Sequence, residues 1–395
     1  MRTQGNAFAN SFDTPDDWAL DSPLNAVPAA VNRRLNQYLA ASHLEFLEIN
    51  PLVTQAIETM GDFIVNGGKR VRPTFAWAGV RAGLDEAEAT TTGGRQPLTT
   101  SGNDAQDPDA LANSFLSAIS AFEFIQACAL IHDDIVDQSD TRRGNPTVHR
   151  VFEGHHRQRE WWGESAHYGT SQAILTGDLA LAWADDLLWD SGLSPERLHQ
   201  CRRAWRAMRT EVIGGQILDL AVEASGTENV DYAWAVIKYK TASYTVSRPL
   251  HVGAALAGAS DQLVQALRTI GENIGIAFQL RDDQLGVFGD PAVTGKPSGD
   301  DLRTGKRTVL IDSALEMGST TQAAALREGL GNVTAEDDVD ALRAIIRDSG
   351  AAGHVESLIT EKSETAIQDI HKAGLSPNLT AELEGYARKL TARSF

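Results

Sequence analysis

Two groups of aspartates stand at the ends of apolar, helix-forming stretches. The first group is Asp133, Asp134 and Asp137, and the second is Asp282 and Asp283. On a helix, residues four apart share a face, so the charges of Asp133 and Asp137 repel unless a cation lies between them. Hard carboxylate oxygens without cysteine or clustered histidine favour Mg²⁺ over zinc. Each group alone is more typical of a solvated helix end, whereas the two together indicate a shared metal site.

Basic residues gather near both groups. The stretch GGKRVRP at 67–73 is a glycine turn entering a helix, where backbone amides with Lys69 and Arg72 can bind a phosphate. Arg142 and Arg143 follow the first aspartates. Three lysines flank the second aspartates: Lys240, Lys296 and Lys306. Any one of these is more simply a surface charge or a charge that offsets a helix dipole. Together they indicate two anionic groups, one bound through metal and one held directly by Lys and Arg.

The elements that carry these residues are predicted to be helices. Apolar residues recur at helical spacing, for example at 31–42 and 339–346. Ser-Pro pairs at 194–195 and 376–377 are typical of helix starts. Alternating strand patterns with hairpin dipeptides are hard to find. The sequence therefore predicts an all-α fold.

Three stretches interrupt the helical pattern. Residues 1–25 are polar and are predicted to be disordered. Residues 85–110 are rich in Thr, Gly, Asp and Pro and predict a long surface loop, and residues 153–169 form a second insertion without a clear period. Because matching apolar helices flank both insertions, residues 26–395 are predicted to form a single domain.

Composition limits the class of protein. The 395 residues include 35 Lys and Arg against 53 Asp and Glu, a formal charge of −18 that disfavours nucleic acid and anionic membranes as partners. Cys128 and Cys201 are too few for a disulfide framework, which favours the cytoplasm. There is no run of 18 apolar residues and no basic-then-apolar leader, so neither a membrane span nor a signal peptide is expected.

Five ordered stretches resemble the motifs of the trans-isoprenyl diphosphate synthase (polyprenyl synthetase) family, from about residue 30 to the C-terminus. They are GGKRVRP at 67–73, DDIVDQSDTRRG at 133–144, KYKTASYT at 238–245, FQLRDDQLGVFGD at 278–290 and GKPSGDDLRTGKRT at 295–308. The resemblance implies a helical bundle of the isoprenoid synthase type around a deep central cavity, usually a homodimer. It also implies three Mg²⁺ ions, replaceable by Mn²⁺, with isopentenyl diphosphate and an allylic diphosphate as substrates.

The resemblance also assigns roles to individual residues. Five aspartates would serve the metals. Asp133 and Asp137 would bind two of the ions and Asp282 the third, and Asp134 and Asp283 would support them. Three cations would hold the allylic diphosphate: Arg142, Lys240 and Lys296. Four polar residues would hold isopentenyl diphosphate: Lys69, Arg72, Gln126 and Arg143. Thr241 and Gln279, together with Lys240, would lie beside the carbocation. Asp301 and Lys306 would help to close the active-site loop.

The chemistry that the family performs agrees with these residue types. Breaking the allylic C–O bond separates a cation from diphosphate, and metal ions with fixed cations stabilise the leaving charge. The carbocation needs a dry apolar cavity, because water would convert it to an alcohol. The released diphosphate is the expected base, so His132 and His149 are predicted to be structural.

One position departs from the family pattern. The second aspartate motif often carries a third carboxylate four residues after Asp282, where this chain has Gly286. We therefore expect weaker Mg²⁺ binding without loss of activity, and tighter Mg²⁺ dependence in Gly286→Asp.

Product length is predicted from small residues before the first aspartates. In the family this position sets product length, and here Cys128 and Ala129 precede Asp133 by five and four residues, roughly 6–8 Å along a helix. Their size leaves a path for a growing tail, with Ile125 and Phe124 as a floor, so Cys128→Phe should shorten the product. The prediction is geranylgeranyl diphosphate (C20), with farnesyl (C15) and longer products as alternatives and the starter (dimethylallyl, geranyl or farnesyl) open.

Two functions of other classes stay open. A class I terpene cyclase shares metal-assisted ionisation, but it has no second diphosphate for GGKRVRP and the Arg142–Arg143 pair to hold. A non-catalytic partner subunit tends to lose its aspartates, whereas here only the carboxylate at position 286 is absent.

Overall fold

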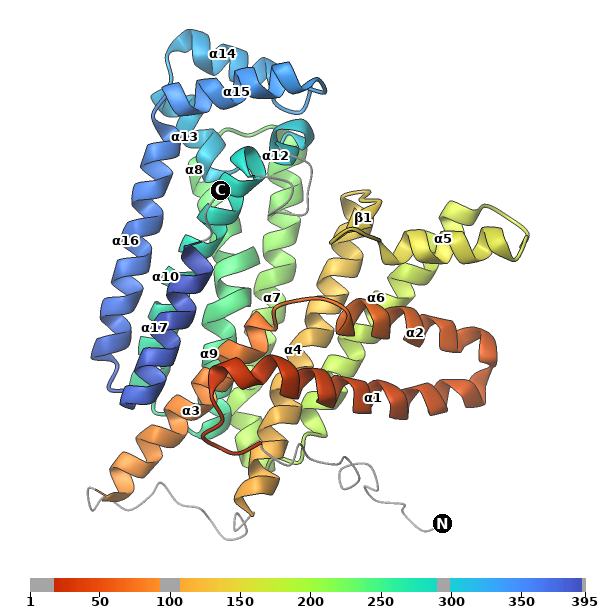
Figure 1. Ribbon diagram of the computed structural model, residues 1–395, viewed down its shortest axis with the longest axis vertical. Helices are drawn as coiled ribbons and strands as arrows, with labels where there is room; N and C mark the ends of the chain where they lie inside the picture. Colours follow the sequence, from red (N-terminus) through yellow and green to blue (C-terminus); the bar gives the residue numbers. More distant parts are fainter. Residues whose placement is uncertain (1–17, 93–106, 290–298, 393–395) are drawn as a thin grey trace. The chain divides into compact units, whose positions relative to one another are not determined.

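The computed structural model describes residues 18–92, 107–289 and 299–392 (Figure 1). Almost all regular structure in these residues is helical, which confirms the all-α prediction. The exception is a small antiparallel hairpin of β1 (Thr141–Arg142) and β2 (Asn145–Pro146).

The chain divides into two compact units, where the sequence predicts one domain. Unit 1 is Met1–Arg81 with Ala87–Gln200, and unit 2 is Ala82–Glu86 with Cys201–Phe395. The first aspartate group belongs to unit 1 and the second to unit 2, so each group is described within its own unit.

Unit 1 is built around the apolar helix α4 (Pro108–Val136), which packs along α6 (Ser165–Trp189). The neighbouring helices α1 (Val27–Ile49) and α2 (Pro51–Val65) lie side by side as a helical hairpin (Figure 1). The remaining elements of unit 1 are η1 (Leu24–Ala26), most of α3 (Val71–Thr92), α5 (Val148–Gln158) and the first turns of α7 (Pro195–Ser225).

Helix α4 has the length and mean hydropathy (1.7) of a membrane-spanning helix. However, 78% of its most apolar stretch is buried inside the protein. The core helix of a soluble protein has this property, since its apolar surface is covered by other helices.

Helices occupy parts of the stretches that the sequence predicts to be irregular. The predicted loop at 85–110 is helical up to Thr92 and again from Pro108, and residues 93–106 lie outside the described residues. The predicted insertion at 153–169 contains the end of α5, a turn over residues 159–164 and the start of α6. The disorder predicted for 1–25 is wrong from Trp18 onward, because that indole is buried and donates to the carbonyl of Ala112 at 3.2 Å. Residues 1–17 lie outside the described residues.

Unit 2 is built around α10 (Asp261–Phe288), which packs along α16 (Ala351–Lys372) and against η2 (Ile237–Ser247). The remaining elements are the rest of α7, α8 (Val230–Val236), α9 (Arg248–Ala257), α12 (Asp300–Thr304), α13 (Val309–Met317), α14 (Thr320–Gly329), α15 (Glu336–Asp348) and α17 (Pro377–Thr391). One apolar core joins the inner faces of α10, α13, α15 and α16.

The element η2 is a π-helix, a rare form that is frequent at functional sites. Its backbone lies against glycines of two neighbouring helices. A Cβ added to Gly275 of α10 would meet Cα of Ala242 at 2.4 Å, and Gly271 makes a similar approach one turn earlier. A Cβ added to Gly215 of α7 would meet the backbone nitrogen of Lys240 at 2.6 Å. Glycine therefore lets three helical backbones come close enough to fix η2 between them.

Gly275→Ala is expected to destabilise the protein by roughly 1–3 kcal/mol, because the new methyl group has no space against Ala242. The matched control is Gly385→Ala in α17, where nothing lies within 4 Å of the added Cβ. That substitution should stabilise the helix by about 0.5–1 kcal/mol. Urea unfolding followed by circular dichroism measures both, and equal effects would contradict close packing at Gly275.

Candidate functional site

The first aspartate group lies at the C-terminal end of α4. Asp133 is half-buried, Asp134 is 1% exposed and Asp137 is the exposed C-cap residue. The helix dipole is negative at this end, so three carboxylates here are unfavourable without nearby cations. The exposed oxygens of Asp133 and Asp137 share one face of the helix and suit a hard divalent ion.

Arg142 supplies one of these cations. Its Nε donates to Oδ1 of Asp134 at 2.7 Å, and its Nη2 donates to Oδ2 of Asp133 at 3.2 Å. The buried Asp134 is therefore held in an ion pair, which leaves Asp133 and Asp137 better placed for metal. Arg142, predicted to hold a diphosphate, contacts the aspartates directly in this structure.

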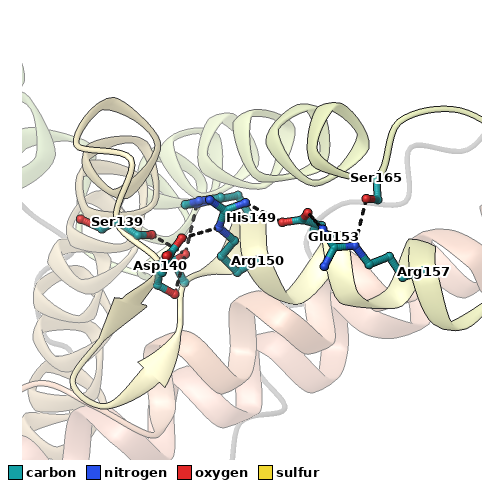
Figure 2. A network of polar contacts seen from close by, with 8 residues as sticks. Ser139, Asp140, His149, Arg150, Glu153, Arg157 and Ser165 are labelled. Atoms are coloured by element: carbon teal, nitrogen blue, oxygen red, sulfur yellow. Dashed lines mark hydrogen bonds and ion pairs between the residues drawn. The ribbon is translucent and has the colours of Figure 1, made fainter.

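Helix α5 ties down the segment that carries Arg142 (Figure 2). Arg150 donates to Asp140 Oδ1 at 2.7 Å and to Glu153 Oε2 at 2.6 Å. Arg157 also pairs with Glu153 and donates to Ser165 Oγ at 3.1 Å, joining α5 to the start of α6. The residue just before the hairpin is thereby joined to α5, and α5 is joined to the start of α6.

Both histidines near this group lie within hydrogen-bonding distance of other protein atoms. The buried His149 lies 3.2 Å (Nδ1) from the hydroxyl of Thr147, and His132 Nε2 lies 3.2 Å from the carbonyl of Ile174. The His132 contact joins α4 to α6, whereas the His149 contact lies within the first turn of α5; the structural role of both histidines stays a prediction.

The basic turn and Arg143 come together within unit 1. A Cβ on Gly67 would lie 2.1 Å from Nη1 of Arg143, so glycine makes room for that guanidinium. Burial, with Arg142 close by, lowers the pKa of Arg143, which marks a concentration of positive charge. Lys69 is exposed and Arg72 is half-buried at the start of α3. Gln126, also predicted to bind substrate, is half-buried on α4, seven residues before Asp133.

Arg70, which the sequence does not single out, orders this turn. It has a left-handed backbone (φ 51°), is buried, and pairs with Glu123 of α4 at 2.5 Å. It also donates to Asn32 of α1 at 2.7 Å and to the carbonyl of Ile64 at 2.6 Å. Its inward direction could not be read from the run Lys-Arg-Val-Arg, in which each basic residue is an equal candidate for substrate binding.

The four predicted wall residues divide between two faces of α4. Phe124 packs edge-on against Tyr38 (5.3 Å between ring centres) and Trp183 (5.9 Å), and Cys128 Sγ lies 3.7 Å from His132 Nδ1. Ala129 instead lies one turn before Asp133 on the partly open face, with Ile125 one turn further back. Among the four, Ala129 is therefore the half-buried residue on the face of Asp133, and the wall role of all four stays a prediction.

The second aspartate group lies at the C-terminal end of α10. Asp282 is exposed, while Asp283 is 2% exposed. Burial raises the pKa of Asp283 to about 7. A metal ion can therefore reach the carboxylate of Asp282, whereas the carboxyl group of Asp283 is buried beside it.

A hydrogen-bonded chain joins Asp283 to the π-helix. Thr241 Oγ1 donates to Gln279 Oε1 at 2.7 Å, and Gln279 Nε2 donates to Asp283 Oδ1 at 2.8 Å. The structure thus brings together two predicted polar residues, and the amide of Gln279 is oriented by both neighbours.

Asp219 of α7 is a partner of a predicted site residue that the sequence analysis misses. Its Oδ2 accepts from Nζ of Lys240 at 2.5 Å. The signal available in the sequence is the pair Gly214-Gly215 inside a helical stretch, since paired glycines there indicate a close backbone approach. That approach brings Lys240 to α7, where Asp219 lies one turn further along.

Lys306 lies between two carboxylates of unit 2. Its Nζ is 3.8 Å from Asp283 Oδ1 and 3.8 Å from Asp301 Oδ2. These carboxylates, Asp301 first, raise the pKa of Lys306, which is therefore a permanent cation. Lys296 lies outside the described residues.

Gly286, the position at which the third carboxylate is missing, lies against the side chain of Asp301. A Cβ on Gly286 would lie 2.0 Å from Oδ2 of Asp301. The Asp301 side chain would have to move in Gly286→Asp, and the expectation that this variant tightens Mg²⁺ dependence stays a prediction.

The donor set fits Mg²⁺ that arrives with a phosphate-bearing ligand. Within the described residues, no three His, Cys, Asp or Glu side chains are grouped closely enough to form a complete metal site. Mg²⁺ is commonly bound by one or two carboxylates together with substrate phosphates. Asp133, Asp137 and Asp282 offer exposed or half-exposed carboxylates of that kind.

Asp283→Asn is expected to raise the melting temperature in metal-free buffer, and by more at about pH 8 than at about pH 5. Between the ordinary pKa of 3.8 and about 7, the native carboxyl keeps a proton that the unfolded chain releases. The free energy of unfolding therefore falls as pH rises through this window, and the full cost persists above it. Asparagine avoids this cost and still accepts from Gln279.

The control is Asp282→Asn, which makes the same change of charge at an exposed position. Its melting temperature should follow the wild-type pH dependence closely. Calorimetry at both pH values measures the two variants, and an identical pH dependence for them would contradict a buried, proton-binding Asp283.

The family model described as polyprenyl synthetase matches residues 54–347, and this range contains every motif described above. Geranylgeranyl diphosphate synthase of Mycobacterium tuberculosis is 31% identical over 91% of this chain and 94% of that protein. Geranylfarnesyl diphosphate synthase of Aeropyrum pernix is 34% identical over 74% of this chain and 79% of that protein.

A solved structure is also similar along most of the chain. It is geranylgeranyl pyrophosphate synthase from Corynebacterium glutamicum, complexed with isoprenyl diphosphate and magnesium. The sequences are 46% identical, with a TM-score of 0.85, over 94% of this chain and 100% of that one.

Proposed function

Since this chain belongs to the polyprenyl synthetase family and is an isoprenyl diphosphate synthase, we propose that it condenses isopentenyl diphosphate with an allylic diphosphate to make geranylgeranyl diphosphate, C20. The similarity to a geranylgeranyl pyrophosphate synthase over 94% of the chain is the observation that carries this proposal. The small side chain of Ala129, on the same face of α4 as Asp133, supports a path for a C20 tail.

The residues around the aspartates are proposed to hold the leaving diphosphate. Mg²⁺ ions, in the proposed number of three, would supply positive charge to offset that of the leaving diphosphate. Asp133, Asp137 and Asp282 would bind these ions, with Asp134 and Asp283 behind them. Three basic residues would bind phosphate oxygens directly: Arg142, Lys240 and Lys296. Arg142 would then exchange its aspartate partners, at least in part, for the substrate.

The isopentenyl diphosphate is proposed to bind at the basic turn of unit 1. Lys69, Arg72, Arg143 and Gln126 would hold it there. The adjacent ion pair of Arg70 with Glu123 keeps the turn in place without taking part in binding. Thr241 and Gln279 would then orient oxygen atoms toward the carbocation, and Asp301 with Lys306 would close the loop over the site.

We propose that the working form is a homodimer in the cytoplasm. Large apolar side chains are exposed at the tip of the α1–α2 hairpin: Leu44, Leu47, Ile49 and Leu52. A second copy of the chain that covered them would remove an apolar patch from water, which is a common reason for such patches.

Incubation of the purified chain with Mg²⁺, isopentenyl diphosphate and farnesyl diphosphate, followed by mass analysis, tests the function. The expected end point is a C20 diphosphate. Longer diphosphates would keep the reaction class and reject the proposed length. Cyclic hydrocarbon without condensation would favour the cyclase, and no turnover with any allylic starter would favour a partner subunit.

Ala129→Phe is expected to shift the product from C20 to C15, because the aromatic ring would lie one turn from Asp133 and block the growing tail. Cys128→Phe, which the sequence analysis favours, is the comparison, since Cys128 packs toward His132. It should change product length less and lower stability more. Product analysis by mass spectrometry measures both, and shortening by Cys128→Phe alone would overturn the assignment of Ala129.

A further inference from the structure

The π-helix η2 is longer than this form usually is. Most π-helices are single turns inside an α-helix, whereas η2 extends over 11 residues. At its end the backbone nitrogen of Arg248 donates to the carbonyl of Ser243, five residues earlier, which is the π-helical pattern. Because this winding is rare, contacts with other elements must favour it over the α-helix.

Glu211 of α7 binds the side chains of the same two residues. Its Oε2 accepts from Oγ of Ser243 at 2.5 Å and from Nε of Arg248 at 2.8 Å. Its Oε1 accepts from Nη2 of Arg248. In a regular α-helix, side chains five residues apart point about 140° away from each other. One carboxylate oxygen that both side chains share therefore fits the π winding better than the α winding.

The guanidinium of Arg248 is enclosed on its other side. Arg248 is 9% exposed, and its Nη1 lies 3.0 Å from Nδ1 of His251. Burial, with Arg248 close by, lowers the pKa of His251 to about 4, so the ring is neutral at pH 7 and can accept this hydrogen bond. The negative charge beside this buried cation comes from Glu211, and an uncharged side chain there would leave the cation without it.

The same face of α7 contacts η2 at two further points. Gly215 and Asp219 follow Glu211 at intervals of four residues, so the three share one face of the helix. The backbone nitrogen of Lys240 would lie 2.6 Å from a Cβ on Gly215, and Nζ of Lys240 donates to Asp219 at 2.5 Å. A change in the winding of η2 would rotate Lys240, and Thr241 beside it, away from their present partners.

We propose that Glu211 is a positioning residue, which stabilises the π winding of η2 and thereby fixes the places of Lys240 and Thr241. The inference rests on the proposed function, in which Lys240 binds the allylic diphosphate and Thr241 lies beside the carbocation. Because both carboxylate oxygens of Glu211 accept from Ser243 and Arg248, it acts through η2 and not on the substrate.

Glu211→Gln tests the proposal by removing the charge. Its matched control is Glu272→Gln, which makes the same change at an exposed pair, where Glu272 of α10 binds Lys238 of η2 at 2.8 Å. Hydrogen exchange of the backbone amides of 237–247, measured by mass spectrometry, should be at least several-fold faster in Glu211→Gln and unchanged in Glu272→Gln. Equal exchange in the two variants would overturn the proposal.

Steady-state kinetics of the same variants test the consequence for Lys240 and Thr241. In Glu211→Gln, kcat should fall at least several-fold while the KM for isopentenyl diphosphate stays the same, because that substrate is proposed to bind in unit 1. Glu272→Gln should change neither. An unchanged kcat in Glu211→Gln, or a KM for isopentenyl diphosphate that rises as much as kcat falls, would count against a positioning role and overturn the proposal.

A second pair of variants leaves the ion pair of Glu211 with Arg248 intact, and so it tests the proposal even where Glu211→Gln does not fold. Ser243→Ala removes one hydrogen bond to Glu211, whereas Ser243→Thr keeps the hydroxyl. Exchange and kcat should change in the same directions in Ser243→Ala, by a smaller factor, and stay near wild type in Ser243→Thr. No difference between these two variants would overturn the proposal. Absence of prenyl transfer in the wild type would reject the proposed function instead, and hydrogen exchange would still test whether Glu211 stabilises η2.

Discussion

The constraint on which the rest of the structure depends is the repulsion of carboxylates at the C-terminal ends of two apolar helices. The helix dipole adds to that repulsion, so an isolated aspartate group there would be costly. In each unit a basic side chain lies beside the carboxylates and reduces this repulsion. Arg142 pairs with Asp133 and Asp134 in unit 1, and Lys306 lies between Asp283 and Asp301 in unit 2.

Both cations come from short segments that would not be ordered by themselves. The hairpin that carries Arg142 is held by the ion pairs of α5, and α12 is held by the α14–α15 hairpin. Much of the surrounding structure therefore serves to position two side chains. This arrangement explains why charged residues remote from the aspartates, such as Glu153 and Glu336, are paired so fully.

The sequence predicts the helical class, the motif residues and the metal preference, because these follow from periodicity and residue type. It does not predict the direction of Arg70 or the role of Asp219, which depend on contacts between segments far apart in the chain. The end of α5 was missed because its buried face combines apolar Val148 and Phe152 with His149, Glu153 and His156, residue types that are not recognised as a core period in the sequence. The sequence shows that position 286 lacks a carboxylate, but only the structure shows that the side chain of Asp301 lies against Gly286.

The π-helix η2 has a consequence for how this stretch can vary in length. A π-helix accommodates a residue that a regular helix of the same span would not hold. Removing one residue would allow α-helical hydrogen bonding, but it would rotate the residues on one side by about 100° relative to the other. Lys240 and Thr241 could then no longer face Asp219 and Gln279 together. The stretch from 237 to 247 should therefore tolerate substitutions on its outer face far better than an insertion or a deletion.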